Sequence, residues 1–597
     1  MSDRVGFVRR ARRTLGRVRR GVRHRVLGRK RSRRNELLAK LDSYQAPQPT
    51  PALPGVRAAV AGGERLRAGL AWEWSQVELA AGTWREALSD NTVDLVLLEM
   101  VGGAIYGWGA NNDTEPRELI GWARGNDVPV LTWVTDGSED PDSAAPWIDG
   151  VSQVFLDNAS ALDKWRARWP EAPVEVLPPA AQPRLHNPRI GGPARRRQPA
   201  AGVLYHGQSP AEDTLGTFDS SKLDVWAADA RAEAALENSG LRSSAMYGKR
   251  LSPVSSALSR YPVFAELGSS AEPSWVAVEA GCAQIPVITE ASAISRIPED
   301  LREHVTAAEN PDEFKLDVAA RLWQTELRDR EGVRLARAVH ARHTFRRRVD
   351  EITRAAGVSV TRPGRTVSAI VPTNRPHQLD NVFTNIARQA HAADAGVELV
   401  LVLHGLDLRT TEVEARAKDA GVDNITVIEA ESSCTLGACM NLGVDAAAGA
   451  FIAKMDDDNF YGRHYLTDLV AAFDYTDAGI VGKWAHYVWL RSTGAVILRT
   501  AYAEHRYERL VQGGSIVFAA DVVRDLRFGD LPRAVDTDIL NRAHEAGIET
   551  YAGDRFNYVS VRGADRHAHT WTIGETALMN RAGSLVFYGD PRAHVDI

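Results

Sequence analysis

The segment Leu436–Gly462, LGACMNLGVDAAAGAFIAKMDDDNFYG, decides how the C-terminal part of the chain folds. Within it, the apolar run Phe451–Met455 predicts a short buried strand that leads directly into three aspartates, Asp456–Asp458. Side chains alternate along an extended segment, so we expect Asp456 and Asp458 to point the same way, about 7 Å apart. The pattern therefore predicts two carboxylates side by side at the end of a strand.

Earlier apolar runs predict three more buried strands, at Val367–Thr373, Val397–His404 and Ile425–Ala430, and a helix is expected over 436–447. This alternation of strands and helices predicts a mostly parallel sheet, with ligands beyond the carboxyl ends of its strands. The aspartates lie at such an end. Carboxylate oxygens suit Mg²⁺ or Mn²⁺ shared with substrate phosphates, and such a cation would stabilise charge on a leaving diphosphate.

Three motifs resemble, in order and spacing, those of family 2 glycosyltransferases: VSAIVPTNRP from Val367, the segment quoted above, and AVDTDILNRAHEAG from Ala534. The resemblance covers 366–597. It implies a single-domain nucleotide-diphospho-sugar transferase fold (GT-A) and transfer of a sugar with inversion at the anomeric carbon.

The same resemblance implies residue roles. Asp458 is expected to bind the metal, and Asp456 the metal or the nucleotide sugar. The full set expected around the nucleotide sugar is Pro372, Thr373, Arg375, Asn441, Asp456 and Asp457. The chain departs from the family at His404, where an Asp often contacts the base, and at Met440, where an Arg often precedes the helix Asn. The nucleotide is therefore not predicted.

Two aspartates, Asp536 and Asp538, stand just before a predicted helix. Inversion by single displacement needs a carboxylate that takes the proton of the attacking hydroxyl. The resemblance places this base at Asp536, although the Glu that precedes it in the family is Val535 here; Asp538 is the alternative. Either residue could instead simply cap the helix.

Other candidates in this domain have ordinary alternatives. The resemblance implies a third metal ligand from a late loop, His569, with His567 second, and two exposed histidines are the alternative. Gly513 and Gly514 would let the backbone approach an acceptor or sugar, or form a plain turn. Trp484 could stack on an acceptor sugar, as could Trp489, but burial in the core is the favoured interpretation.

The preceding region predicts two doubly wound α/β halves, 56–190 and 201–357, divided by a Pro-, Gly- and Arg-rich break. Its apolar runs are Val93–Met100, Val128–Val134, Val154–Leu156, Val174–Leu177, Val203–Tyr205 and Ile285–Thr289. VDLVLLEMVGGAIYGWG and SSAEPSWVAVEAGCAQIPVIT resemble the two halves of spore-maturation-type, two-domain (GT-B) glycosyltransferases. That resemblance implies a donor site at Ser274 and Glu279; the alternatives are a helix cap and a solvated helix face.

A basic leader, 1–41, precedes a Pro-rich linker, 42–55. The leader has sixteen Lys and Arg against two Asp and Glu, a net charge of +14, whereas the whole chain has −5. Its apolar residues recur at helical spacing, which favours an amphipathic helix on an anionic membrane surface; a disordered tail and binding to RNA or another polyanion are alternatives. Three cysteines exclude a disulfide framework, and we expect a cytoplasmic protein, peripheral on the inner face of the cell membrane.

These observations predict an inverting glycosyltransferase that uses Mn²⁺ or Mg²⁺. The expected partners are a nucleotide-diphospho-sugar and a surface or cell-wall glycan, or lipid-linked, acceptor; no nucleic-acid substrate is expected. Two alternatives stay open. The N-terminal region is a non-catalytic module that binds an acceptor or a partner, or both regions are active and make two different linkages.

Overall fold

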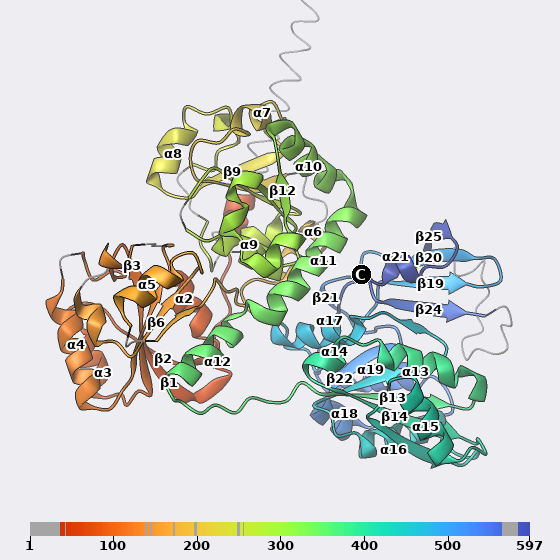
Figure 1. Cartoon of the computed structure of the whole chain (residues 1–597). Coiled ribbons are helices and arrows are strands. Elements are labelled where there is room, and N and C mark those ends of the chain that lie inside the picture. Colours follow the sequence, from red (N-terminus) through yellow and green to blue (C-terminus); the bar gives the residue numbers. More distant parts are fainter. Residues whose placement is uncertain are drawn as a thin grey trace, which may run out of the picture.

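The computed structural model places four β-sheets along the chain (Figure 1). It describes residues 36–41, 43–110, 112–137, 140–143, 146–170, 173–195, 200–247, 251–254, 256–270, 272–563 and 583–597. Most of the basic leader and both late-loop histidines, His567 and His569, lie outside these ranges.

The first sheet has the strand order β2-β1-β3-β5-β6-β7, all parallel, and β4 pairs antiparallel with β3. Its strands are β1 (Leu53–Ala61), β2 (Trp74–Glu78), β3 (Leu95–Val101), β4 (Ala104–Ile105), β5 (Val130–Val134), β6 (Gln153–Leu156) and β7 (Val174–Val176). Its helices are α2 (Glu64–Leu70), α3 (Trp84–Ser89), α4 (Thr114–Gly125) and α5 (Leu162–Arg168). The first strand begins inside the predicted linker.

The second sheet is parallel throughout, in the order β12-β11-β10-β8-β9. Its strands are β8 (Ala201–Tyr205), β9 (Leu223–Ala227), β10 (Phe264–Leu267), β11 (Val287–Glu290) and β12 (Thr306–Ala308). The helices here are α6 (Pro188–Arg195), α7 (Glu212–Gly216), α8 (Ala230–Leu236), α9 (Trp275–Cys282), α10 (Pro311–Trp323) and α11 (Thr325–Arg342).

Two segments pack away from their sequence neighbours. The helix α12 (Phe345–Ala355) follows the second sheet in sequence, yet Phe345, Val349 and Ile352 pack in a core cluster of the first. Leu37, in a helical turn at the end of the predicted leader, is buried in a core cluster of the second sheet. Packed structure therefore already begins within the predicted leader 1–41, at Leu37.

The third sheet is mixed, in the order β15-β14-β13-β16-β22-β18-β23-β21. Its strands are β13 (Val367–Thr373), β14 (Val397–His404), β15 (Ile425–Ala430), β16 (Phe451–Met455), β18 (Ile480–Gly482), β21 (Arg506–Tyr507), β22 (Ser515–Ala519) and β23 (Thr550–Ala552). The first four are parallel and have the predicted bounds, and β22 runs antiparallel to β16. The helices are α13 (Leu379–Ala387), α14 (His391–Asp394), α15 (Thr410–Asp419), α16 (Leu436–Ala446), α17 (Tyr465–Ala471), α18 (Ala520–Leu526) and α19 (Val535–Glu545).

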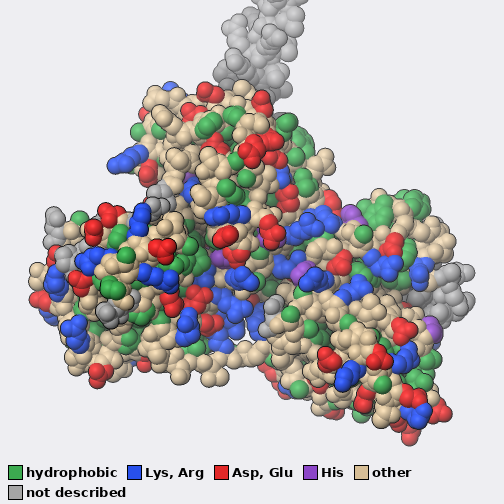
Figure 2. Space-filling model, in the orientation of Figure 1, with side chains coloured by type: hydrophobic (Ala, Val, Ile, Leu, Met, Phe, Trp, Pro, Cys, Tyr) green, Lys and Arg blue, Asp and Glu red, His purple; other side chains and the backbone are tan. Residues whose placement is uncertain are grey.

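A fourth sheet, not predicted from the sequence, has the order β17-β24-β19-β20-β25. Its strands are β17 (Phe460–Tyr461), β19 (His486–Leu490), β20 (Ala495–Arg499), β24 (Tyr558–Arg562) and β25 (Gly583–Tyr588), and α21 (Arg592–Val595) follows. Hydrophobic side chains gather on the surface over β20 and β25 (Figure 2), where Leu585, Val586 and Tyr588 are exposed.

The fold is therefore mixed α/β with parallel sheets, as predicted. Every helix in the described ranges is too short or too polar to cross a membrane.

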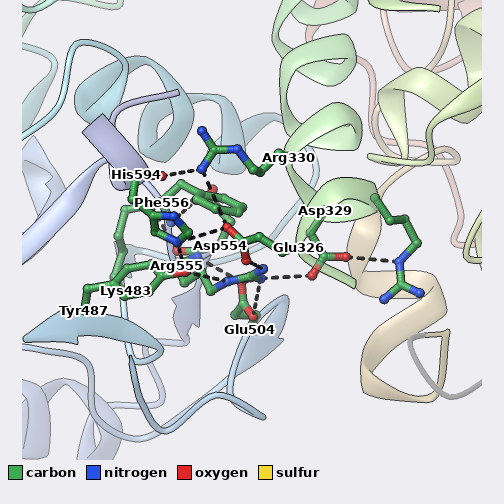
Figure 3. Close-up of polar contacts among 11 residues, drawn as sticks. Glu326, Asp329, Arg330, Lys483, Tyr487, Glu504, Asp554, Arg555, Phe556 and His594 are labelled. Atoms are coloured by element: carbon green, nitrogen blue, oxygen red, sulfur yellow. Dashed lines mark hydrogen bonds and ion pairs between the residues drawn. The ribbon is translucent and has the colours of Figure 1, made fainter. Parts of the chain in front are cut away.

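Buried ion pairs join α11 to the C-terminal domain. Arg555 extends toward α11 and pairs with Asp329 (2.9 Å) and Glu326 (2.5 Å) on that helix and with Glu504 (3.3 Å) of its own domain (Figure 3). Arg337, also on α11, makes two hydrogen bonds of 2.9 Å with the Asp468 carboxylate. These ion pairs hold α11 and the C-terminal domain in one relative position, because separating the two surfaces would leave poorly solvated charges without their partners.

We predict that Arg555→Met destabilises the full chain by about 3–5 kcal/mol, because it removes the buried cation that pairs with the buried Glu504 and with Asp329 and Glu326 of α11. The matched control is Arg592→Met, whose partner Asp590 is exposed; that change should cost at most about 1 kcal/mol. Urea-unfolding midpoints of the two variants measure the difference, and equal midpoints would contradict this role of Arg555.

Candidate active site

The three aspartates that follow β16 are held in place by different cations. Thr373 and Arg375, at the end of β13, clamp the buried Asp457: Thr373 Oγ1 donates to its carboxylate at 2.6 Å and Arg375 Nε at 3.1 Å. Arg375 Nη1 also donates to Asp458 Oδ2 at 3.0 Å. Asp457 thus faces into the protein and fastens the triplet to β13.

Asp456 faces the other way, toward Lys454. The Lys454 ammonium donates to Asp456 Oδ1 at 2.7 Å and lies 3.3 Å from Asp536 Oδ1. Burial alone lowers the pKa of Lys454, but the two carboxylates outweigh burial and raise it above the usual lysine value. The ammonium group therefore stays charged between Asp456 and Asp536.

The base candidate Asp536 lies in the first turn of α19, and its side chain is 29% exposed. Burial and the Asp456 charge raise the pKa of Asp536, and Lys454 opposes them. The residue before this helix, Ala534, has φ +60°, a left-handed conformation that is uncommon for a residue with a Cβ.

The alternative base, Asp538, has a structural partner. Its carboxylate accepts from Arg542 Nε at 2.9 Å, and Arg542 also donates to the carbonyls of Leu526 (2.7 Å) and Arg527 (2.6 Å). Asp538 therefore belongs to a network that fixes the end of α18, and the structure brings Asp536 rather than Asp538 to the triplet.

Gly513 and Gly514 pack against the carboxylates, not against open space. A Cβ on Gly513 would collide with the Asp536 carboxylate, and one on Gly514 with Asp456 and, at 2.7 Å, with Asn459 Nδ2. The close neighbours of this backbone are the two aspartates, and the predicted approach to an acceptor or sugar stays a prediction. A plain turn would not require glycine at both positions.

Asn459 and Tyr558 belong to the site and were missed. Asn459 Nδ2 donates to Asp456 Oδ2 and to Tyr558 Oη, both at 3.1 Å. Tyr558 begins β24 of the unpredicted sheet, so no motif pointed to it. Asn459 follows the triplet directly in sequence, and this position beside the three aspartates is the sequence feature that could have indicated its place in the site.

Other predicted residues are not brought to this group. Asn441 uses both ends of its amide on the backbone of Phe528, at 2.8 and 2.9 Å. Trp484 and Trp489 are partly buried and pack against core clusters. Pro372, within β13, is partly exposed.

The second predicted donor site is occupied by structural contacts. Ser274 is the N-cap of α9, where its Oγ accepts from Ala277 N at 3.0 Å, and it donates to Glu266. Glu279 is buried, not solvated, and accepts from Arg65 Nε at 2.6 Å. The Glu279–Arg65 pair joins the regions of the two N-terminal sheets, whereas these contacts of Ser274 stay within the region of the second sheet.

Carboxylates also occupy the glycine N–H groups of this region. Glu99 accepts from Gly63 N at 2.5 Å, Asp136 from Gly102 N at 2.5 Å, Asp157 from Gly137 N at 3.1 Å and Glu290 from Gly268 N at 2.8 Å. Free N–H groups at strand ends are what bind phosphates in nucleotide sites. Here they are paired with negative charges, which disfavours a diphosphate.

Comparison with known proteins finds a family match within the C-terminal domain. Residues 368–519, a quarter of the chain, match the family model described as "Glycosyl transferase family 2". The match runs from β13 through the aspartate triplet and the two glycines to β22. The chain therefore contains a glycosyltransferase domain. No curated protein matches it.

Two solved structures are similar over part of their length. A mannosyltransferase, PcManGT, from Pyrobaculum calidifontis in complex with GDP-Man and Mn²⁺ is 18% identical, covering 35% of this chain and 59% of its own, with a TM-score of 0.28. S. aureus TarS 1–349 in complex with UDP-GlcNAc is 17% identical, covering 34% and 59%, with a TM-score of 0.29. This chain thus spans about 59% of either protein, and at these TM-scores the likeness carries no argument.

We predict that Gly513→Ala lowers turnover about 10²-fold, because the new methyl group displaces the Asp536 carboxylate, and displacements near 1 Å cost about that much. Gly364→Ala, in the linker before the domain, should leave turnover unchanged, because the nearest atom that its added Cβ would meet is Thr366 Oγ1 at 3.9 Å. The measurement is nucleoside diphosphate release by the full chain. Parent-level turnover by Gly513→Ala would contradict the packing argument.

Proposed function

We propose that this chain is an inverting, metal-dependent glycosyltransferase whose catalytic centre lies in a GT-A-type domain, preceded by two GT-B-like halves. One observation carries the proposal: Asp456 and Asp536, from different elements, meet around Lys454 beside two glycines that leave room for them. The family match at 368–519 supports the reaction class.

Asp536 is the base in this proposal. It takes the proton of an acceptor hydroxyl while that oxygen bonds to the anomeric carbon and the bond to the diphosphate breaks. Attack opposite the leaving group inverts the anomeric centre. The partial exposure of Asp536 gives an acceptor access to it, and its raised pKa makes it a stronger base than an ordinary aspartate.

Asp456 and Asp458 are the proposed metal ligands. Both carboxylates lie at the end of β16, and the Asp456 side chain is 35% exposed and that of Asp458 17% exposed, which gives a cation access to them. The described residues hold no group of three or more His, Cys, Asp or Glu side chains able to bind a metal. Two carboxylates are nevertheless enough for Mg²⁺ or Mn²⁺ when substrate phosphates complete the shell. The bound cation would neutralise charge on the leaving diphosphate.

The N-terminal sheets, in this proposal, bind a glycan acceptor or a partner and are not a second transferase. The engagement of Ser274 and Glu279 in structural contacts supports this choice over the bifunctional alternative. The acceptor is proposed to be a surface or cell-wall glycan, and the basic leader to hold the chain on the inner face of an anionic membrane.

We predict that Asp536→Asn lowers sugar transfer about 10²–10⁴-fold, because an amide cannot take the acceptor proton. It should leave the melting temperature and nucleotide binding as in the parent. Asp538→Asn is the control: it weakens the bridge to Arg542 and should cost stability more than turnover. An active Asp536→Asn beside an inactive Asp538→Asn would move the base to Asp538.

We predict that Mn²⁺ increases the thermal stabilisation by UDP or GDP in the parent, and that EDTA removes this increase. Asp458→Asn should abolish the Mn²⁺-dependent part, because it removes a charged ligand. Asp525→Asn, an exposed aspartate in α18, should behave as the parent. Full Mn²⁺ dependence in Asp458→Asn would exclude Asp458 as a ligand.

We predict that removal of residues 1–35 abolishes binding to anionic vesicles while leaving turnover of a soluble acceptor intact. The cut stops at 35 because Leu37 is buried in a core. Binding by the parent should weaken as salt rises, since the Debye length falls to about 8 Å at physiological ionic strength. Equal vesicle binding before and after the cut would favour a disordered tail.

A further inference from the structure

A lysine, Lys454, lies in the interior of the third sheet. Its strand β16 is paired on both sides, and Lys454 is in register with Ile370 on β13 and Ile516 on β22. Its side chain is 5% exposed and shares a face with Ile452, which packs in an apolar cluster. An apolar residue here would avoid the cost of burying a charge, so the reason for a lysine lies in what its ammonium group contacts.

The ammonium group contacts three separate elements. It donates to Asp456 Oδ1 at the end of β16 (2.7 Å) and to the carbonyl oxygen of Gly513 before β22 (3.1 Å), and it lies 3.3 Å from Asp536 Oδ1 in α19. An ammonium group has three N–H bonds, so these contacts match its capacity. Without it, two carboxylates from different elements would face each other and repel.

We propose that Lys454 is a positioning residue, which holds Asp536 at a fixed place beside Asp456 so that the base is aimed at the acceptor hydroxyl whose proton it takes. This inference rests on the proposed function, since only a base needs to be aimed. Lys454 itself touches neither reactant; it acts through the two carboxylates.

The chain offers a matched lysine for comparison. Lys483 is also fully buried, and its Nζ donates to Asp554 Oδ1 (3.1 Å) and to the carbonyl oxygen of Asp554 (3.0 Å). Both of these acceptors belong to one residue, whereas the acceptors of Lys454 belong to three elements. Replacing Lys483 therefore measures what loss of a buried lysine does to the domain without release of the base.

The direct test is a crystal structure of full-length Lys454→Met, which keeps the apolar stem and removes the ammonium group. The expected result is that the Asp536 carboxylate leaves its place beside Asp456 while α19 keeps its backbone position. An unmoved Asp536 would overturn the proposal. Should Lys454→Met fail to fold, Lys454→Gln, which can donate to only some of the three acceptors, is solved instead, with the same two outcomes.

The kinetic test is a double-mutant cycle on the full chain, measured as UDP or GDP release from UDP- and GDP-sugars with Mn²⁺ present. Lys454→Met should lower kcat about 10²-fold with little change in the donor KM. In the Asp536→Asn background, the same change should have no further effect, because the base is already lost.

Lys483→Met supplies the control. In the double variant with Asp536→Asn, the fold-losses of kcat of the two single variants should multiply, because the two residues act independently. If the kcat loss of Lys454→Met also multiplied with that of Asp536→Asn, the positioning role of Lys454 would be overturned. Parent-level release by Asp536→Asn alone would instead remove Asp536 as the base, so failure of the proposed function is distinguishable from failure of this inference.

Discussion

The candidate site depends on the balance of charge at the end of β16. Four carboxylates converge there from two elements, and among the described residues Lys454 and Arg375 form ion pairs with them. Each cation has a separate task. Arg375 binds the carboxylates of Asp457 and Asp458 and ties them to the end of β13, while Lys454 joins Asp456 to Asp536 of α19.

The same principle, burial of paired charges, joins the two regions of the chain. Arg555 and Arg337 hold α11 against the C-terminal domain. Arg555 also lies three residues before Tyr558, whose hydroxyl contacts Asn459 beside Asp456. A short segment of backbone thus connects the interface with the candidate site. The N-terminal sheets are therefore held in one orientation relative to the transferase domain.

Much of this architecture could be predicted, and the reason is local. The strands β13, β14, β15 and β16 are continuous apolar runs bounded by polar residues, so their bounds follow from the sequence. The fourth sheet could not be predicted, since β17 has two residues and β25 is largely exposed. The convergence of Asp456, Asp536 and Lys454 joins residues some 80 positions apart, which the sequence does not show to be close in space. Lys454 by itself is one charged residue within an otherwise apolar strand, and this gives no sign of its partners. Ser274 shows the converse, because a helix cap and a ligand site have the same local signature, and only its contacts distinguish them.

The most direct test of the account is anomalous diffraction at the manganese edge from crystals of the full chain soaked with Mn²⁺ and UDP or GDP. The account predicts a manganese peak within coordination distance of the Asp458 carboxylate and of the nucleotide diphosphate, beyond the end of β16. A manganese–nucleotide complex bound instead between the two N-terminal sheets, with the β16 site empty, would contradict it.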